Sequence, residues 1–146
     1  MVDPANPAVL AGMKGTTPAG SPAGIDHPFN AALFAAGVEP FFSASTYDCT
    51  ILVGLAAAAA HSDAPDKIRD HFAGNLTGKV DCTTYADCVQ ALRNGKTIHY
   101  RGASSRFDRW QRFEPGTGTF DVWLLGPDGR PALLPATAQI PVDPGR

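Results

Sequence analysis

Residues 47–61 read YDCTILVGLAAAAAH, and this stretch decides the fold class. It is long enough for about four helical turns and is apolar nearly all round. Such a helix should be buried on more than one side. Ser45 or Thr46 stands just before it and can cap its first turn. We therefore predict a long helix from Tyr47 to about His61.

Three shorter helices are predicted from their capping residues. The expected caps are Asp26 for a helix from about Pro28, Ser62 or Asp63 for the next, and Thr84 for the last. Asp87 follows Thr84 by three residues, which is the spacing of a capping box. The last helix should run to about Arg93.

The hydrophobic period changes after Gly95. Residues 97–100 are short and extended, and residues 119–125 alternate in the way of a strand. The turn sequence GPDG at 126–129 lets residues 131–134 return as a paired or edge segment. Helices in the first half and strands in the last third indicate the α/β class. We expect the helices to cover a mostly parallel sheet with short terminal strands.

Length and composition are those of one modest domain. The chain has 146 residues with 44% hydrophobic content, enough for a core but not for two full domains. Many of its 15 Gly and 13 Pro residues crowd near the two ends. We therefore predict irregular segments at 1–25 and 135–146 and a folded domain at 26–134.

The charge pattern argues against nucleic acid as a partner. The 12 basic and 14 acidic residues give a net charge of −2 and form no basic stripe. One cluster mixes cations with aromatic side chains: Arg101, Arg106, Phe107, Arg109, Trp110, Arg112 and Phe113. Acidic neighbours accompany it, so we interpret it as a loop that packs its aromatic side chains on the fold.

Neither a membrane span nor an export signal is expected in this sequence. No apolar run reaches the ~18 residues of a spanning helix, since Thr50 interrupts the longest one. The first residues, MVDP, lack the basic start and apolar region of a signal peptide.

The sequence carries no signature of an enzyme, cofactor or metal centre. A thiol nucleophile could in principle pair Cys49 with one of the four histidines, but no local signature supports such a hydrolase. We expect Cys49 to be a small buried hydrophobe. A zinc site from Cys82, Cys88 and His71 or His99 has unsuitable spacing and lacks a second cysteine pair.

Cys82 and Cys88 are better suited to a disulfide. One precedes a helix cap and the other lies within the following helix, close enough to bond without strain. The bond would pin that helix to its entry loop, and it points to an oxidising compartment.

Several motifs in order resemble one family. They are LAGMKGTTP from Leu10, STYDCTILVGLAAAAA from Ser45, CTTYADCVQALRNGKTIHYRGAS from Cys82, and GTFDVW with GPDGR from Gly118. Together with the amphipathic helix that follows the first motif, they resemble the C-terminal part of type I periplasmic binding proteins. These are the receptors for branched-chain amino acids that feed ABC importers.

The resemblance implies two α/β lobes, joined by three crossovers, that close on an amino acid or amide and deliver it to an ABC permease. It implies a periplasmic or extracytoplasmic location for the full-length protein and no enzymatic activity. Residues upstream of the matched region would hold the ligand's carboxylate and amino group. Phe42 maps to the aromatic residue that lines the cleft, or Phe41 if the register slips by one, while Tyr47 and Asp48 match the motif.

The chain departs from the family pattern near its last third. Arg101 stands where relatives often carry Asp, Ser105 replaces a second Gly, and residues 109–113 replace a Phe-Asp-x-x-Gly turn. The link to the closing strand should therefore differ. An alternative function is a ligand-sensing or interaction module of the same fold without a transport role.

Overall fold

The computed structural model of the protein describes residues 6–22, 24–38, 41–108, 110–111 and 114–142. Its α-helices are α1 (Pro28–Ala35), α2 (Ser43–Ala60), α3 (Pro65–Phe72) and α4 (Tyr85–Arg93). Its strands are β1 (Lys14–Pro18), β2 (Val80–Cys82), β3 (Ile98–Tyr100), β4 (Trp110–Gln111), β5 (Glu114–Pro115), β6 (Gly118–Leu125), β7 (Pro131–Leu133) and β8 (Ile140–Val142). Short 3₁₀ turns cover Pro7–Leu10, Ala73–Leu76 and Ala136–Ala138.

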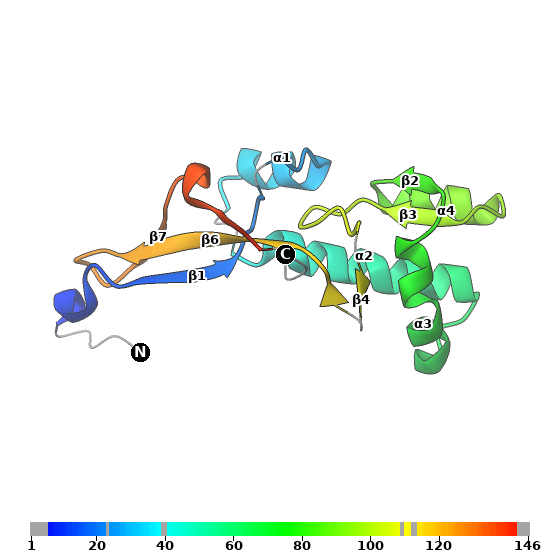
Figure 1. Cartoon of the computed structure of the whole chain (residues 1–146), viewed down its shortest axis with the longest axis horizontal. Helices are drawn as coiled ribbons and strands as arrows, with labels where there is room; N and C mark the ends of the chain where they lie inside the picture. Colours follow the sequence, from blue (N-terminus) through cyan, green and yellow to red (C-terminus); the bar gives the residue numbers. More distant parts are fainter. Residues whose placement is uncertain (1–5, 23, 39–40, 109, 112–113, 143–146) are drawn as a thin grey trace.

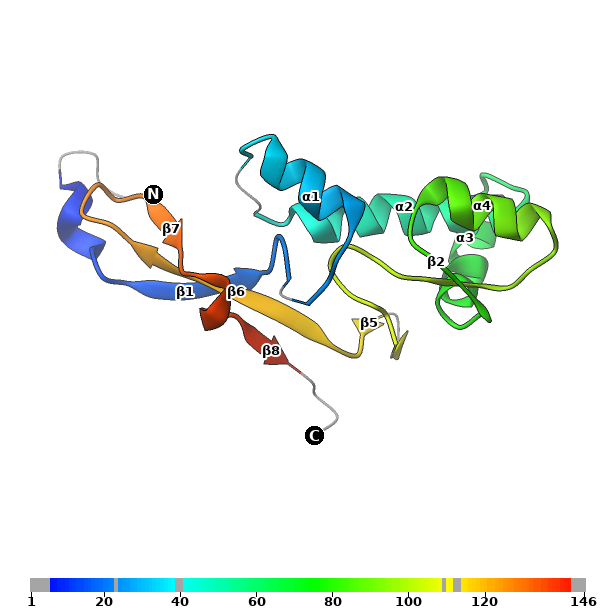
Figure 2. The same ribbon diagram turned by 90° about the horizontal axis from the view of Figure 1, so that it is seen from above.

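The elements form two bodies at opposite ends of an elongated molecule (Figures 1 and 2). The sheet body contains β1, β6, β7 and β8, and the helical body contains α2, α3, α4, β2 and β3. The chain passes from the sheet body to the helical body after β1, and it returns between β3 and β6. We call residues 19–27 the first crossover and residues 101–117 the second crossover.

The α/β class is confirmed, but the mostly parallel sheet is wrong. In the four-stranded sheet, β1, β7 and β8 all pair antiparallel with β6, and only the small β2–β3 pair is parallel. A short turn over residues 126–130 leads straight from β6 into β7, which favours antiparallel pairing of these two strands.

Two of the strands lie in segments that we expected to be irregular. β1 falls within residues 1–25 and β8 within residues 135–146. The composition hides β1 because Gly15 and Pro18 are poor strand residues. Both residues fit this strand: Gly15 lies against the ring of Trp123, and Pro18 ends an edge strand.

The helix caps agree with the sequence for α4 and correct it for the other three helices. The hydroxyl of Thr84 accepts the N–H of Asp87 at 3.2 Å and donates to its carboxylate at 2.7 Å, which confirms Thr84 as the cap of α4. Helix α1 is capped by His27 instead of Asp26. Helix α2 starts two residues before Ser45, after Phe42 in the left-handed conformation. Helix α3 is preceded by Ala64 at its cap position, instead of Ser62 or Asp63.

The core of the helical body lies between α2, α4 and the two parallel strands. It consists of Leu52, Leu55, Leu76, Cys82, Cys88, Ile98, Tyr100 and Phe107. One face of α2 is fully buried, whereas Cys49 and Val53 are exposed on another. The predictions that α2 is buried on more than one side, and that Cys49 is buried, are therefore wrong for that face. Among the described residues, no helix is long and apolar enough to cross a membrane.

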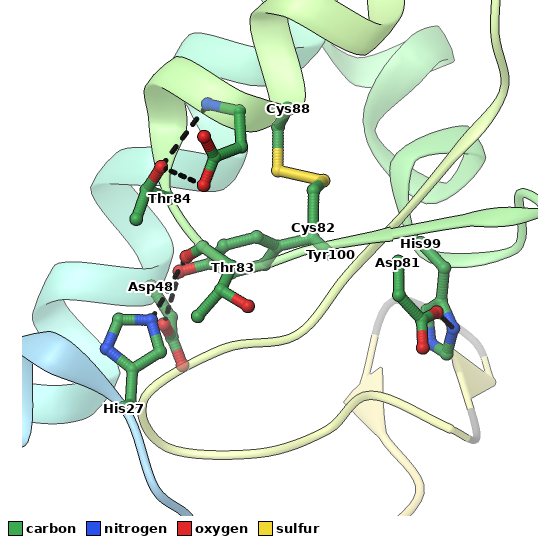
Figure 3. The surroundings of a disulfide bond; sticks show 10 residues. His27, Asp48, Asp81, Cys82, Thr83, Thr84, Cys88, His99 and Tyr100 are labelled. Carbon is green, nitrogen blue, oxygen red and sulfur yellow. Dashed lines mark hydrogen bonds and ion pairs between the residues drawn. A yellow bond between two sulfur atoms is a disulfide. The ribbon is translucent and has the colours of Figure 1, made fainter.

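The disulfide between Cys82 and Cys88 is present and joins the end of β2 to α4 (Figure 3). Both cysteines are buried in the core, at 6% and 0% exposure. The bond pins α4 to its entry loop, as expected from the sequence.

Removing this disulfide should lower stability modestly because the loop it closes is short. We expect the double variant Cys82→Ser, Cys88→Ser to lose about 2 kcal/mol in free energy of unfolding. Urea denaturation measures this loss, and Cys49→Ser serves as the matched control because its thiol is exposed and unbonded. A double variant as stable as the control would contradict the prediction.

Candidate functional site

Phe41 and Phe42 precede α2 and form the outer part of the candidate site. Phe42 adopts a left-handed backbone conformation, with φ of 56°, and is 53% exposed. Phe41 is half-buried. A left-handed conformation is uncommon for a bulky residue, so its presence here marks a constrained entry into α2.

Tyr47 lies one turn into α2 within an aromatic cluster. Its ring stacks on Phe29 of α1, with centroids 4.3 Å apart, and meets the edge of His27 at 5.5 Å. Partial burial, and then the nearby Asp48 carboxylate, raise the pKa of Tyr47 above its ordinary value. Tyr47 therefore joins α1 to α2.

His27 is a site residue that the sequence analysis missed. It is 2% exposed, and its Nδ1 accepts the N–H of Phe29 at 3.1 Å. Its Nε2 lies 3.1 Å from the carbonyl oxygen of Thr83 within the disulfide loop. Because one nitrogen accepts and the other must donate, these contacts select the neutral Nε2–H tautomer. The only sequence signal was its position before Pro28, at a helix start.

Asp48, which lies beside Tyr100 (Figure 3), is the most densely bonded side chain of the site, at 2% exposure. One carboxylate oxygen accepts the hydroxyl of Tyr100 at 2.7 Å and the N–H of Ala103 at 2.8 Å. The other accepts the N–H and the hydroxyl of Ser104, at 2.7 and 2.5 Å. These four donors balance the cost of burying a charge and fix the start of the second crossover on α2.

Gly102 makes this close approach possible. A Cβ on residue 102 would overlap both the Asp48 carboxylate and the Phe107 ring. The side chain of Asn30 on α1 adds a further restraint by donating to the carbonyl oxygen of Ala103 at 3.1 Å. Residues 102–105 are therefore held by α1 and α2 together.

The four site residues expected from the sequence thus separate into two roles. Tyr47 and Asp48 face inward and organise α1, α2 and the second crossover. Phe42 offers the exposed aromatic surface, with Phe41 partly covered beside it. Ligand binding by any of the four stays a prediction.

An apolar groove of about 650 Å³ adjoins Asp48 between α2, α3 and the second crossover. Its walls are Ser45, Asp48, Cys49, Leu52, Pro65, Ile68, Arg69, Phe72, Ser104 and Phe107. The groove explains why Cys49 is exposed, since the thiol lies on an open wall. It was not foreseen from the sequence because its walls come from three separate segments.

Arg101, one of the departures from the family pattern, has a structural role. Its guanidinium pairs with Asp81 of β2 at 3.2 Å and also with Asp108. These bonds hold the second crossover against β2.

Nearby, Phe107 is buried in the core, as we expected of the aromatic loop. Arg109, Arg112 and Phe113 lie outside the described residues, as does the side chain of Trp110.

Among the described residues, no three His, Cys, Asp or Glu side chains are grouped to hold a metal ion. His71 and His99 are occupied elsewhere: Nδ1 of His71 is bonded to the Lys67 carbonyl oxygen, and Nδ1 of His99 lies 3.2 Å from Asp81.

No protein-family model, curated protein or solved structure matches the chain.

Removing the Asp48 carboxylate should cost more than any other single change in the site. In Asp48→Ala the buried Tyr100 hydroxyl and two backbone N–H groups lose their acceptor, so we expect a loss of about 3–5 kcal/mol. Chemical denaturation measures it, with the exposed Asp63→Ala as a control that should change by less than about 0.5 kcal/mol. A loss for Asp48→Ala as small as that of the control would contradict the assigned role.

Tyrosine ionisation offers an independent test. Burial, the Asp48 charge and its hydrogen bond raise the pKa of Tyr100 far above the ordinary value of about 10. The raised pKa of Tyr100 stabilises the folded state fully below about pH 10. Above that pH this stabilisation falls, because the Tyr100 hydroxyl of the unfolded chain loses its proton at a lower pH than that of the folded chain. In a spectrophotometric titration of the folded protein, Tyr100→Phe should leave the phenolate signal at about pH 11 unchanged. A reduced signal would show that Tyr100 ionises there.

Proposed function

We propose that the chain is part of the solute-binding component of an ABC importer, for branched-chain amino acids or related amides. The supporting observation is where the five motifs fall. The first and the last two motifs form β1, β6 and the turn into β7, whereas the middle motifs form α2 and the β2–α4–β3 unit. The chain thus visits one body, then the other, and returns, as expected for two lobes linked by crossovers.

Exposed apolar side chains support the proposal that further polypeptide covers this chain. Phe34 on α1 is 90% exposed, and Val38 and Phe42 are more than half exposed. Large exposed apolar surfaces commonly mark an interface. In the proposed receptor, the remainder of both lobes would cover them.

The proposed binding step uses Phe42 as an apolar contact for the solute's aliphatic side chain. The groups that hold the carboxylate and amine would come mainly from the rest of the receptor. A solute that touches both lobes favours the closed arrangement in proportion to its extra affinity for that state. The closed receptor would then deliver the solute to its permease, with no chemical step.

The proposed location is outside the cytoplasm. The buried disulfide is suited to an oxidising compartment, where such bonds persist.

A thermal-shift experiment tests this function on the oxidised 146-residue chain. We expect leucine, isoleucine, valine or a small amide at millimolar concentration to raise the melting temperature. At ten times Kd the folded state gains about 1.4 kcal/mol, which corresponds to about 3–6 °C. Phe42→Ala should reduce the shift.

Phe34→Ala is the matched control, because it removes an equally large and even more exposed ring from α1. It should leave the shift unchanged. Equal shifts in both variants, or a cooperative melt with no shift for any amino acid or amide, would overturn the role of Phe42 as an apolar contact for the solute in this chain.

A further inference from the structure

A second cavity lies at the junction of the two bodies, away from Phe42. It measures about 610 Å³ and takes walls from both crossovers, from the start of β6 and from β8. Gly24 and Ile25 form the first-crossover wall, and Ser104 to Arg106 with Asp108 form the second-crossover wall. We call this cavity the junction cleft.

Arg106 gives the junction cleft an available cation. Its guanidinium donates to the carbonyl oxygen of Gly24 at 3.3 Å and makes no ion pair with any described residue. A guanidinium has five N–H donors, so most of them are open to a ligand. Asp108, the other charge on the wall, is already paired with Arg101, which leaves Arg106 without a competing carboxylate.

Ser105 adds a second donor beside this cation. It is 7% exposed, and its oxygen accepts the N–H of Phe107 at 3.1 Å. The hydroxyl proton is therefore available to donate to a ligand. A carboxylate matches one guanidinium and one hydroxyl, because the planar fork of the guanidinium fits its two oxygens and neutralises its single charge.

The lining of the cleft is also partly apolar. Ile25, Pro141 and Val142 contribute to it, together with the hydroxyl-bearing Thr117 and Thr119. A ligand that reaches from Arg106 to these residues needs an anionic head and a short aliphatic chain.

We infer that the junction cleft binds short-chain aliphatic carboxylates, with Arg106 and Ser105 holding the carboxylate. This site is separate from Phe42 and does not rest on the proposed transport function. A bound carboxylate would contact the second crossover and the sheet body at once, and so would stabilise one arrangement of the two bodies.

Nuclear magnetic resonance titration of the 146-residue chain with sodium butyrate and sodium acetate tests the inference. Sodium chloride at the same ionic strength provides the reference. The amides of Gly24 and Gly118, which line the cleft from the two sides, should shift saturably. Butyrate should bind about tenfold more tightly than acetate because its two additional methylene groups become buried. Butylammonium should not bind.

Arg106→Gln should weaken butyrate binding at least about tenfold, since it removes the charge-assisted bonds. The matched control is Arg93→Gln on α4, outside the cleft, which should bind as the unchanged chain does. Arg106 is exposed, so the variant should keep its fold, as its other amide signals will show. The inference is overturned if no saturable shift occurs or if Arg106→Gln binds butyrate unchanged. Phe42→Ala separates the two sites, because it should leave butyrate binding intact whatever it does to amino acids.

Discussion

The buried carboxylate of Asp48 is the constraint on which the helical body depends. A charge at 2% exposure requires several donors, and the chain supplies them from β3 and from the start of the second crossover. To bring these groups within reach, α2 must lie against β3 and residue 102 must lack a side chain. The position of the second crossover therefore follows from one charge on one helix.

A second buried carboxylate has a comparable role in the sheet body. Asp121 on β6 is 5% exposed and accepts the N–H of Gly20 at 3.0 Å and the side-chain amide of Gln139 at 2.6 Å. These bonds attach the start of the first crossover to β6. At its other end, the first crossover is held by His27 and the Thr83 carbonyl oxygen, inside the disulfide loop. The sheet body thus holds the start of the first crossover, and the helical body holds its end.

This anchoring links the fold to the two proposed sites. Phe42 stands at the start of α2, on the same helix that carries Asp48, so its position is set by the helical body. Arg106 follows directly after the segment that Asp48 holds, and it faces the first crossover. The two sites therefore share the support that Asp48 provides but use different chemistry: an exposed ring in one case, and a guanidinium beside a buried hydroxyl in the other.

The sequence by itself determined the features that depend on near neighbours. The Thr84 cap of α4, the presence of a helix after Asp63, the turn from β6 to β7 and the Cys82–Cys88 pairing each involve residues at most a few positions apart. Local hydrogen bonding and side-chain period are sufficient to predict them. Phe41, Phe42, Tyr47 and Asp48 were singled out by motif, but the motif did not reveal that Asp48 is enclosed by four donors.

Only the tertiary structure decided the features that join distant segments. Strand β1 pairs with β6 more than a hundred residues later, His27 reaches Thr83, and Asp48 reaches residues 100–104. The antiparallel sheet, the His27 cap and both cavities depend on such contacts. No local sequence pattern predicts these features. Each one joins residues that are far apart along the chain, and the spacing between them follows no helix or strand period.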